Sequence, residues 1–324
     1  MKYVGIHTQQ RRNNVRSILL LCLFPCLVVA LVFLFCYLLA WVILGEEQGV
    51  DVLPLTMQWF TESIPWAIGA VLIWFIIAWF SNNAIINAAT GAHSLDRRES
   101  KRVYNLVENL CMTQGMSMPK VNVIEDDSLN AYASGINKQT YTVTLSRGII
   151  NKLNDEELEA VIAHELSHIR NNDVRLLIVS IVFVGIFSMV AQVAMRAAYH
   201  ASWSSGGSSR NNKGNGTVII MLLAAVVAAI GYFFATIMRF AISRKREYLA
   251  DAGSAEMTRN PRALANALRK ISADPDIEAV ERDDVAQLFI EHPGRQAKSA
   301  LHSFSGLFAT HPPIEKRIEV LEQF

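Results

Sequence analysis

Four long runs of apolar residues dominate the chain, and polar and charged residues are frequent between them. The first run, Ile18 to Leu44, contains no charged residue, and the second extends from Ser63 to Phe80. The third extends from Leu176 to Met195, and the fourth from Thr217 to Met238. A helix that spans a bilayer needs about 20 consecutive, mostly apolar residues. The pattern therefore predicts about four transmembrane helices, although the last two runs also fit buried helices of a soluble domain.

Lysine and arginine mark the cytoplasmic side of a membrane protein. Four of these residues precede the first run, whereas the loop 45–62 has none. Further lysine and arginine residues follow the second run at 97–102 and the fourth run at 239–246. Three basic residues between the last two runs, Arg196, Arg210 and Lys213, oppose this pattern. The distribution predicts that the N-terminus and the segments 81–175 and 239–324 lie in the cytoplasm.

This topology divides the chain into four parts. They are 1–80 with the tail and two membrane anchors, 81–175 with a small sheet and a helix that carries His164 and His168, 176–238 with a transmembrane hairpin and a Ser/Gly-rich loop, and 239–324 with Glu247 and C-terminal helices. The 30 Lys and Arg residues nearly balance the 29 Asp and Glu residues, so nothing indicates a nucleic-acid partner. The four cysteines have no zinc-finger spacing and suggest no disulfide framework.

Shorter elements are predicted between the second and third apolar runs. Residues 97–110 have the spacing of an amphipathic helix. Alternating, β-rich segments then predict strands at Lys120–Ile124, Asn130–Ala133 and Thr140–Leu145. The edge of such a sheet could bind an extended peptide as an added strand, or the sheet could be a purely structural meander.

A longer helix is predicted from Asn154 to Arg170. Asn154 is a favourable N-cap, and Glu157 three residues later completes a capping box. Apolar residues then recur at steps of three and four, which is typical of a helix with one buried face. They are Leu158, Val161, Ile162, Leu166 and Ile169.

This helix carries the motif His164-Glu165-Leu166-Ser167-His168. Positions i and i+4 share one helix face, so both imidazoles can bind one zinc ion, with Glu165 beside the open coordination position. This chemistry is typical of a zinc peptidase. Two histidines on a partly buried helix without a metal remain an equal alternative for the motif alone.

A third ligand is expected downstream, because a catalytic zinc ion of this kind has three protein ligands. Glu247 and Asp251 are spaced i, i+4 on a predicted helix. Glu247 can complete the zinc site, and Asp251 can accept a hydrogen bond from a ligand histidine. The alternative is that both are solvated helix charges, with Glu247 paired to Arg244.

The C-terminal part adds two helices, Pro261–Ile271 and Pro313–Leu321, and two weaker site candidates. His292 and His311 could assist an oxyanion, although a lone loop histidine is more often merely exposed.

Four segments together resemble the HtpX-type membrane zinc metalloproteases, which are relatives of the Ste24-type CAAX prenyl proteases. The matching segments are His164-Glu-Leu-Ser-His168, Arg246-Glu-Tyr-Leu-Ala-Asp251, Asn130-Ala-Tyr-Ala-Ser-Gly135 and Thr310-His-Pro-Pro313. The resemblance covers almost the whole chain. It implies one Zn²⁺ per chain bound by His164, His168 and Glu247, with Glu165 as catalytic base and a substrate-facing role for Asn130.

The expected fold class is a mainly α membrane protein with about four transmembrane helices and a cytoplasmic, zincin-like α+β catalytic domain that contains a small β-sheet. The resemblance implies an endopeptidase of the bacterial inner membrane that cleaves misfolded or damaged membrane proteins and unfolded polypeptides during stress. A CAAX prenyl protease is the closest alternative, but that type builds a larger chamber than this chain can supply. A transporter is disfavoured because the apolar runs have almost no ionisable groups. An inactive scaffold is disfavoured because the zinc motif is undamaged.

Overall fold

The computed structural model describes residues 6–44, 51–176, 213–240, 245–272 and 312–324, together with a few positions between 178 and 196. The chain divides into two compact units. One comprises Ile18–Ala78 and Ser180–Arg239, and the other comprises Met1–Ser17, Trp79–Val179 and Phe240–Phe324. The division into four parts by membrane topology stays a prediction.

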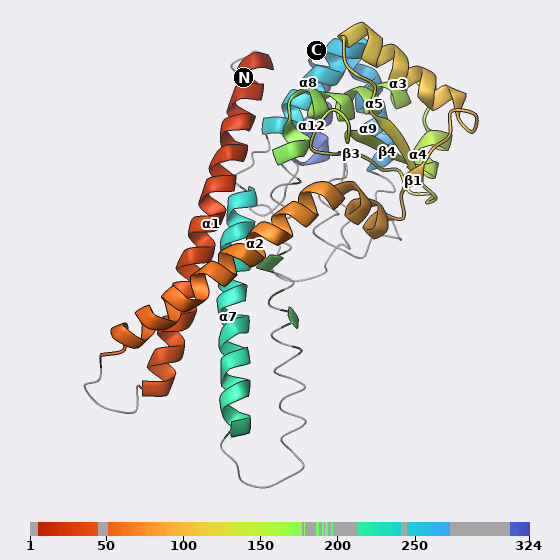
Figure 1. Ribbon diagram of the computed structural model, residues 1–324. Coiled ribbons are helices and arrows are strands. Elements are labelled where there is room, and N and C mark those ends of the chain that lie inside the picture. Colours follow the sequence, from red (N-terminus) through yellow and green to blue (C-terminus); the bar gives the residue numbers. More distant parts are fainter. Residues whose placement is uncertain are drawn as a thin grey trace. The chain divides into compact units, whose positions relative to one another are not determined.

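Long apolar helices form the unit that contains residues 18–78. Helices α1 (Ile6–Leu44), α2 (Leu53–Thr90) and α7 (Lys213–Phe240) contribute to it (Figure 1). Within the described part of the chain, two stretches are long and apolar enough to cross a membrane, Cys22–Leu44 and Leu53–Ile77. They correspond to the first two predicted spans.

The second of these helices begins ten residues earlier than the predicted span, at Leu53 instead of Ser63. Asp51 accepts a hydrogen bond from the Leu53 main-chain N–H at 3.0 Å, and Pro54 lies in the first helical turn, where a missing N–H costs nothing. Local capping therefore extends the helix into a segment predicted to be a loop. Helix α7 contains a shorter apolar stretch, and most of the predicted span Leu176–Met195 lies outside the described residues.

The other unit contains a four-stranded sheet in the order β1-β2-β4-β3. Its strands are β1 (His93–Ser94), β2 (Lys120–Ile124), β3 (Ala131–Ser134) and β4 (Thr142–Ser146). Strands β2 and β4 are parallel, and the other two pairs are antiparallel. The sheet is therefore not a simple meander, because the last strand in sequence lies between the two that precede it. The sequence pattern did not predict the short strand β1.

The turn between β3 and β4 moves both strands by one or two residues from their predicted bounds. Gly135 has φ 103°, and a Cβ there would lie 2.3 Å from the Thr140 main-chain oxygen. Only glycine fits this close approach. Asn137 and Thr140 hydrogen-bond to each other across the turn, which keeps Thr140 out of the strand.

Six helices accompany the sheet in this part of the described chain. They are α3 (Lys101–Gln114), α4 (Arg147–Lys152), α5 (Asp155–Arg170), α8 (Lys245–Thr258), α9 (Pro261–Ile271) and α12 (Ile314–Glu322). Helix α5 contacts α3, α8 and α9 as well as β3 and β4 (Figure 1). Its predicted bounds agree with the structure, but it is buried on more than its apolar face because other elements cover it on several sides.

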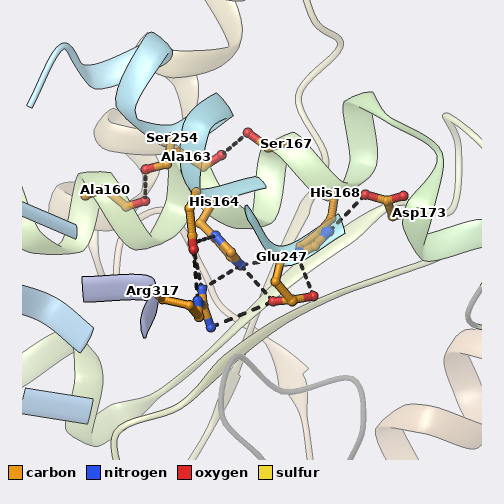
Figure 2. A network of polar contacts seen from close by, with 10 residues as sticks. Ala160, Ala163, His164, Ser167, His168, Asp173, Glu247, Ser254 and Arg317 are labelled. Atoms are coloured by element: carbon orange, nitrogen blue, oxygen red, sulfur yellow. Dashed lines mark hydrogen bonds and ion pairs between the residues drawn. The ribbon is translucent and has the colours of Figure 1, made fainter. Parts of the chain in front are cut away.

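Small residues allow α5 and α8 to pack closely. The Ser254 hydroxyl donates to the Ala160 main-chain oxygen at 2.6 Å, as Figure 2 shows. Nearby, a Cβ added to Gly253 would lie 2.4 Å from Ser167 Oγ. The short separation of the two helices therefore depends on these side chains being small.

Replacing Gly253 by alanine is expected to lower the thermal unfolding midpoint, because overpacking a core costs about 1–3 kcal/mol. Circular dichroism in detergent would measure the change. Adding Ser167→Ala should recover part of the loss, since it removes the atom nearest to the new methyl group. Gly69→Ala serves as control, because its Cβ would meet nothing within 4 Å. Wild-type stability of the Gly253 variant would contradict this packing.

Candidate metal centre

Helix α5 holds the predicted zinc-binding motif in a fixed register. Its capping box is complete, with Asn154 Oδ1 accepting from the Glu157 N–H at 2.9 Å and Glu157 Oε2 accepting from the Asn154 N–H at 3.0 Å. Glu157 also pairs with Lys270 at 2.7 Å. His164 and His168 are four residues apart in this helix, so they lie about one turn apart on one face, and their Nε2 atoms are 3.2 Å apart.

Glu247 lies in the first turn of α8 and faces both histidines (Figure 2). Its Oε2 is 3.7 Å from His164 Nε2, and its Oε1 is 3.7 Å from His168 Nε2. Donor atoms from these three residues all lie within 4.8 Å of one another. The structure therefore brings together the three residues that the sequence suggested as ligands, from two helices nearly 80 residues apart.

The donor set fits a tetrahedral zinc ion. With metal–donor bonds of about 2.0–2.2 Å, the donors of such a site lie about 3.3–3.6 Å apart. The three separations of 3.2, 3.7 and 3.7 Å are close to that range. Two imidazole nitrogens and one carboxylate also match the protein ligands of catalytic zinc sites, which leave a fourth coordination position open.

A carboxylate lies behind each histidine. Asp251 Oδ1 is 3.0 Å from His164 Nδ1, and Asp173 Oδ2 is 3.2 Å from His168 Nδ1. Such contacts keep the proton on Nδ1 and leave the Nε2 lone pair available for a metal. Two Nε2 lone pairs at 3.2 Å repel each other unless a proton or a metal cation lies between them. The arrangement therefore calls for a cation at this position.

The protonation of His164 follows from the same geometry. Burial lowers its pKa, but the carboxylates of Asp251 and Glu247 outweigh this effect and raise the pKa to about 9. A histidine binds a metal through a deprotonated nitrogen, so metal binding by His164 is coupled to proton release.

Sequence reasoning missed Arg317, which belongs to the centre. It lies in α12, its side chain is 1% exposed, and it donates to Asp251 Oδ2 from Nε at 2.9 Å and to Oδ1 from a terminal nitrogen at 2.7 Å. Its guanidinium also lies 3.7 Å from Glu247 Oε2 (Figure 2). A signal was present, because Arg317 shares a helix face with the apolar Ile314 and Leu321.

Asp251 was predicted to support a histidine, and it contacts His164 from a fully enclosed position. Burial raises the pKa of its carboxyl group, but the charge of Arg317 and the contact with His164 outweigh burial and lower the pKa below the usual range. Asp251 and Glu247 are 2% and 5% exposed, so the alternative that both are solvated helix charges is wrong. Arg244 lies outside the described residues.

Glu165 is buried within the same helix, at 2% exposure. Burial raises the pKa of its carboxyl group, and the charges of His164 and His168 partly oppose this. A carboxylate in this environment is a stronger base than one in water.

Asn130, the next predicted residue, is 1% exposed and directly precedes β3. Its Oδ1 accepts from the Ala131 N–H at 3.0 Å, and its N–H donates to Ser146 Oγ at 3.1 Å. These bonds fix the start of a strand that contacts α5. His311 and His292 lie outside the described residues.

Comparisons with known proteins agree with this chemistry. The model of peptidase family M48 matches residues 97–324. A protease HtpX homolog of Bacteroides fragilis is 71% identical over 325 residues, which cover 100% of both chains. A protease HtpX homolog of Listeria innocua is 43% identical over 261 residues, or 79% of this chain and 84% of that relative.

Among solved structures, the crystal structure of S. mikatae Ste24p matches with a TM-score of 0.47 and 20% identity, and the match covers 88% of this chain and 65% of that chain. The resemblance inferred from the sequence motifs is confirmed by the family match and by the full-length relative. Because the family match includes the histidine motif and both downstream carboxylates, the chain belongs to peptidase family M48 and is a membrane metalloprotease.

Proposed function

We propose that the protein is a zinc-dependent endopeptidase that cleaves misfolded or damaged membrane proteins on the cytoplasmic side of the bacterial inner membrane. The observation that carries this proposal is the convergence of His164, His168 and Glu247 on one point, with the buried Glu165 on the same helix. The proposal assigns the first three residues as zinc ligands and Glu165 as the catalytic base.

The chemistry follows from these roles. A zinc ion bound by these residues would act as a Lewis acid that polarises the scissile carbonyl and lowers the pKa of the attacking water. The Glu165 carboxylate takes a proton from the attacking water, so that the water oxygen bonds to the carbonyl carbon. Glu165 then gives this proton to the peptide nitrogen as the carbon–nitrogen bond breaks. Asp251 and Arg317 hold His164 in place throughout.

Strand β3 is the proposed binding edge for the substrate. In the sheet as described, β3 pairs only with β4 and is the outermost strand on its side. It also contacts α5, which carries the histidine motif. An extended peptide that adds to this edge would run beside the catalytic helix, and an unfolded segment satisfies that requirement better than a folded one. A substrate-facing role for Asn130, which is buried at the start of β3, stays a prediction.

The predicted membrane location of the chain supports membrane proteins as the substrate class. Two described stretches are apolar enough to span a bilayer, and the lysine and arginine distribution favours a cytoplasmic site. His168 precedes the third apolar run by only eight residues. A site close to the bilayer surface would reach the exposed loops of damaged membrane proteins.

Metal removal tests the proposed function. The full-length protein purified in detergent should contain about one zinc ion per chain by elemental analysis, and it should cleave an unfolded membrane protein. A chelator should stop cleavage, and one equivalent of zinc should restore it. A prenylated CAAX peptide serves as the comparison substrate. Preferential cleavage of that peptide, or cleavage that persists without metal, would contradict the proposal.

A further inference from the structure

The segment that follows α5 folds back over the metal centre. Helix α5 ends at Arg170, and Asn172 then has φ 59°, a left-handed conformation that asparagine tolerates better than most residues. Helical backbone resumes at Asp173. This sharp turn carries the Asp173 carboxylate back toward the preceding helix, where Oδ2 lies 3.2 Å from His168 Nδ1 (Figure 2). Asp173 is 2% exposed.

Asp173 also contacts the helix that carries Glu247. Arg246, the residue directly before Glu247, donates to the Asp173 main-chain oxygen at 3.3 Å, and its guanidinium lies 3.9 Å from Asp173 Oδ1. One residue therefore connects the end of α5, which carries His168, with the start of α8, which carries Glu247.

Neighbouring side chains fix the turn itself. The Tyr141 hydroxyl donates to Asn172 Oδ1 at 3.3 Å, which joins the turn to the residue before β4. On the other side, the Arg175 guanidinium lies 5.8 Å from the centre of the Trp79 ring, a cation–π distance. The neighbours of Asp173 are thus held by the sheet and by α2, and Asp173 itself is held by Arg246 of α8.

The two histidines have matching surroundings. His164 contacts Asp251, and Arg317 holds Asp251. His168 contacts Asp173, and Arg246 holds Asp173. Each imidazole therefore contacts a carboxylate residue, and that residue in turn contacts an arginine. The two groups of residues come from different parts of the chain. The first set was partly visible in the sequence, whereas the second arises only from the turn at Asn172.

We propose that Asp173 is a positioning residue of the metal centre, and that its contact with Arg246 sets the separation between His168 and Glu247. The carboxylate fixes the ring orientation and the tautomer of His168, and the main-chain oxygen anchors the first turn of α8. This inference rests on the proposed function only in taking His168 and Glu247 as zinc ligands.

Zinc affinity of the full-length protein in detergent tests the inference. Asp173→Ala should weaken zinc binding by about 10- to 100-fold in competition with a chelating indicator, the usual effect of losing such a partner. Asp173→Asn should weaken it less, because an amide oxygen can still accept from Nδ1. Arg246→Gln should also weaken binding. Glu108→Gln is the control, since this carboxylate lies on α3, pairs with the exposed Arg97 and should leave the affinity unchanged.

Cobalt substitution separates positioning from a general contribution to the fold. If Asp173 orients His168, the absorption bands of bound Co²⁺ should shift in the alanine variant, while the metal-free variant unfolds close to the metal-free wild type. A zinc affinity within twofold of wild type would overturn the proposal. The proposal would also be overturned if the metal-free variant had a lower unfolding midpoint and its cobalt bands were unchanged, because Asp173 would then support the fold and not the orientation of His168. A wild-type protein that binds no zinc would instead refute the proposed function.

Discussion

Replacing Glu165 by glutamine is expected to lower kcat for peptide cleavage by about 10²- to 10⁴-fold, the usual contribution of a general acid–base residue. Glutamine keeps the size of the side chain and one acceptor oxygen, but it cannot take a proton from the attacking water. The buried position at 2% exposure limits access of a replacement base from solvent. A cleavage assay on an unfolded membrane protein, with zinc content measured in parallel, gives the result.

Zinc content should not change in this variant, because Glu165 is not part of the donor set of His164, His168 and Glu247. Glu159→Gln is the matched control, since it makes the same change on the same helix six residues earlier. Undiminished cleavage by the Glu165 variant would remove this residue from the mechanism. Loss of zinc together with activity would mean that Glu165 supports the metal centre instead.

Replacing Arg317 by methionine is expected to destabilise the protein by about 3–5 kcal/mol, because it leaves a buried charge without its partner. Arg317 is 1% exposed and makes two hydrogen bonds to Asp251, which is itself 2% exposed. Zinc affinity should fall as well, since Asp251 would no longer be held against His164. Thermal unfolding and competition with a chelating indicator measure the two effects. Lys316→Met is the control, because Lys316 is exposed on the same helix.

The pH dependence of this effect has a definite sign. In the wild type, the lowered pKa of Asp251 stabilises the fold above the pKa of the unfolded carboxyl group, and this contribution is lost as pH falls through the lowered value. Without Arg317, burial dominates and the pKa rises, so Asp251 takes up a proton at a higher pH. The stability difference between wild type and variant should therefore be largest near neutral pH and decrease on acidification. A difference that grows with acid would contradict the pairing.

Local sequence determined the catalytic helix. The bounds of α5, the complete capping box at Asn154 and the shared face of His164 and His168 depend on residues within a few positions of one another, and all agree with the structure. The same is true of α9, which begins at Pro261 as predicted. Glu247 and Asp251 could be chosen because they too share one face of a short helix. That both residues belong to the site of His164 and His168 was inferred from the resemblance and from zinc chemistry.

Tertiary structure decided which distant groups support that helix. Arg317 is 66 residues from Asp251, and nothing in the local pattern of α12 identifies the carboxylate that it binds. Asp173 reaches His168 only because Asn172 turns the chain back. The position of β4 between β2 and β3 likewise depends on a parallel pairing across more than 20 residues. The sequence by itself therefore determined the elements and the reactive groups they carry, since helical periodicity and capping act over a few residues. The folded chain decided the partners of those groups, since burial and charge pairing act between segments that only the packed core brings together.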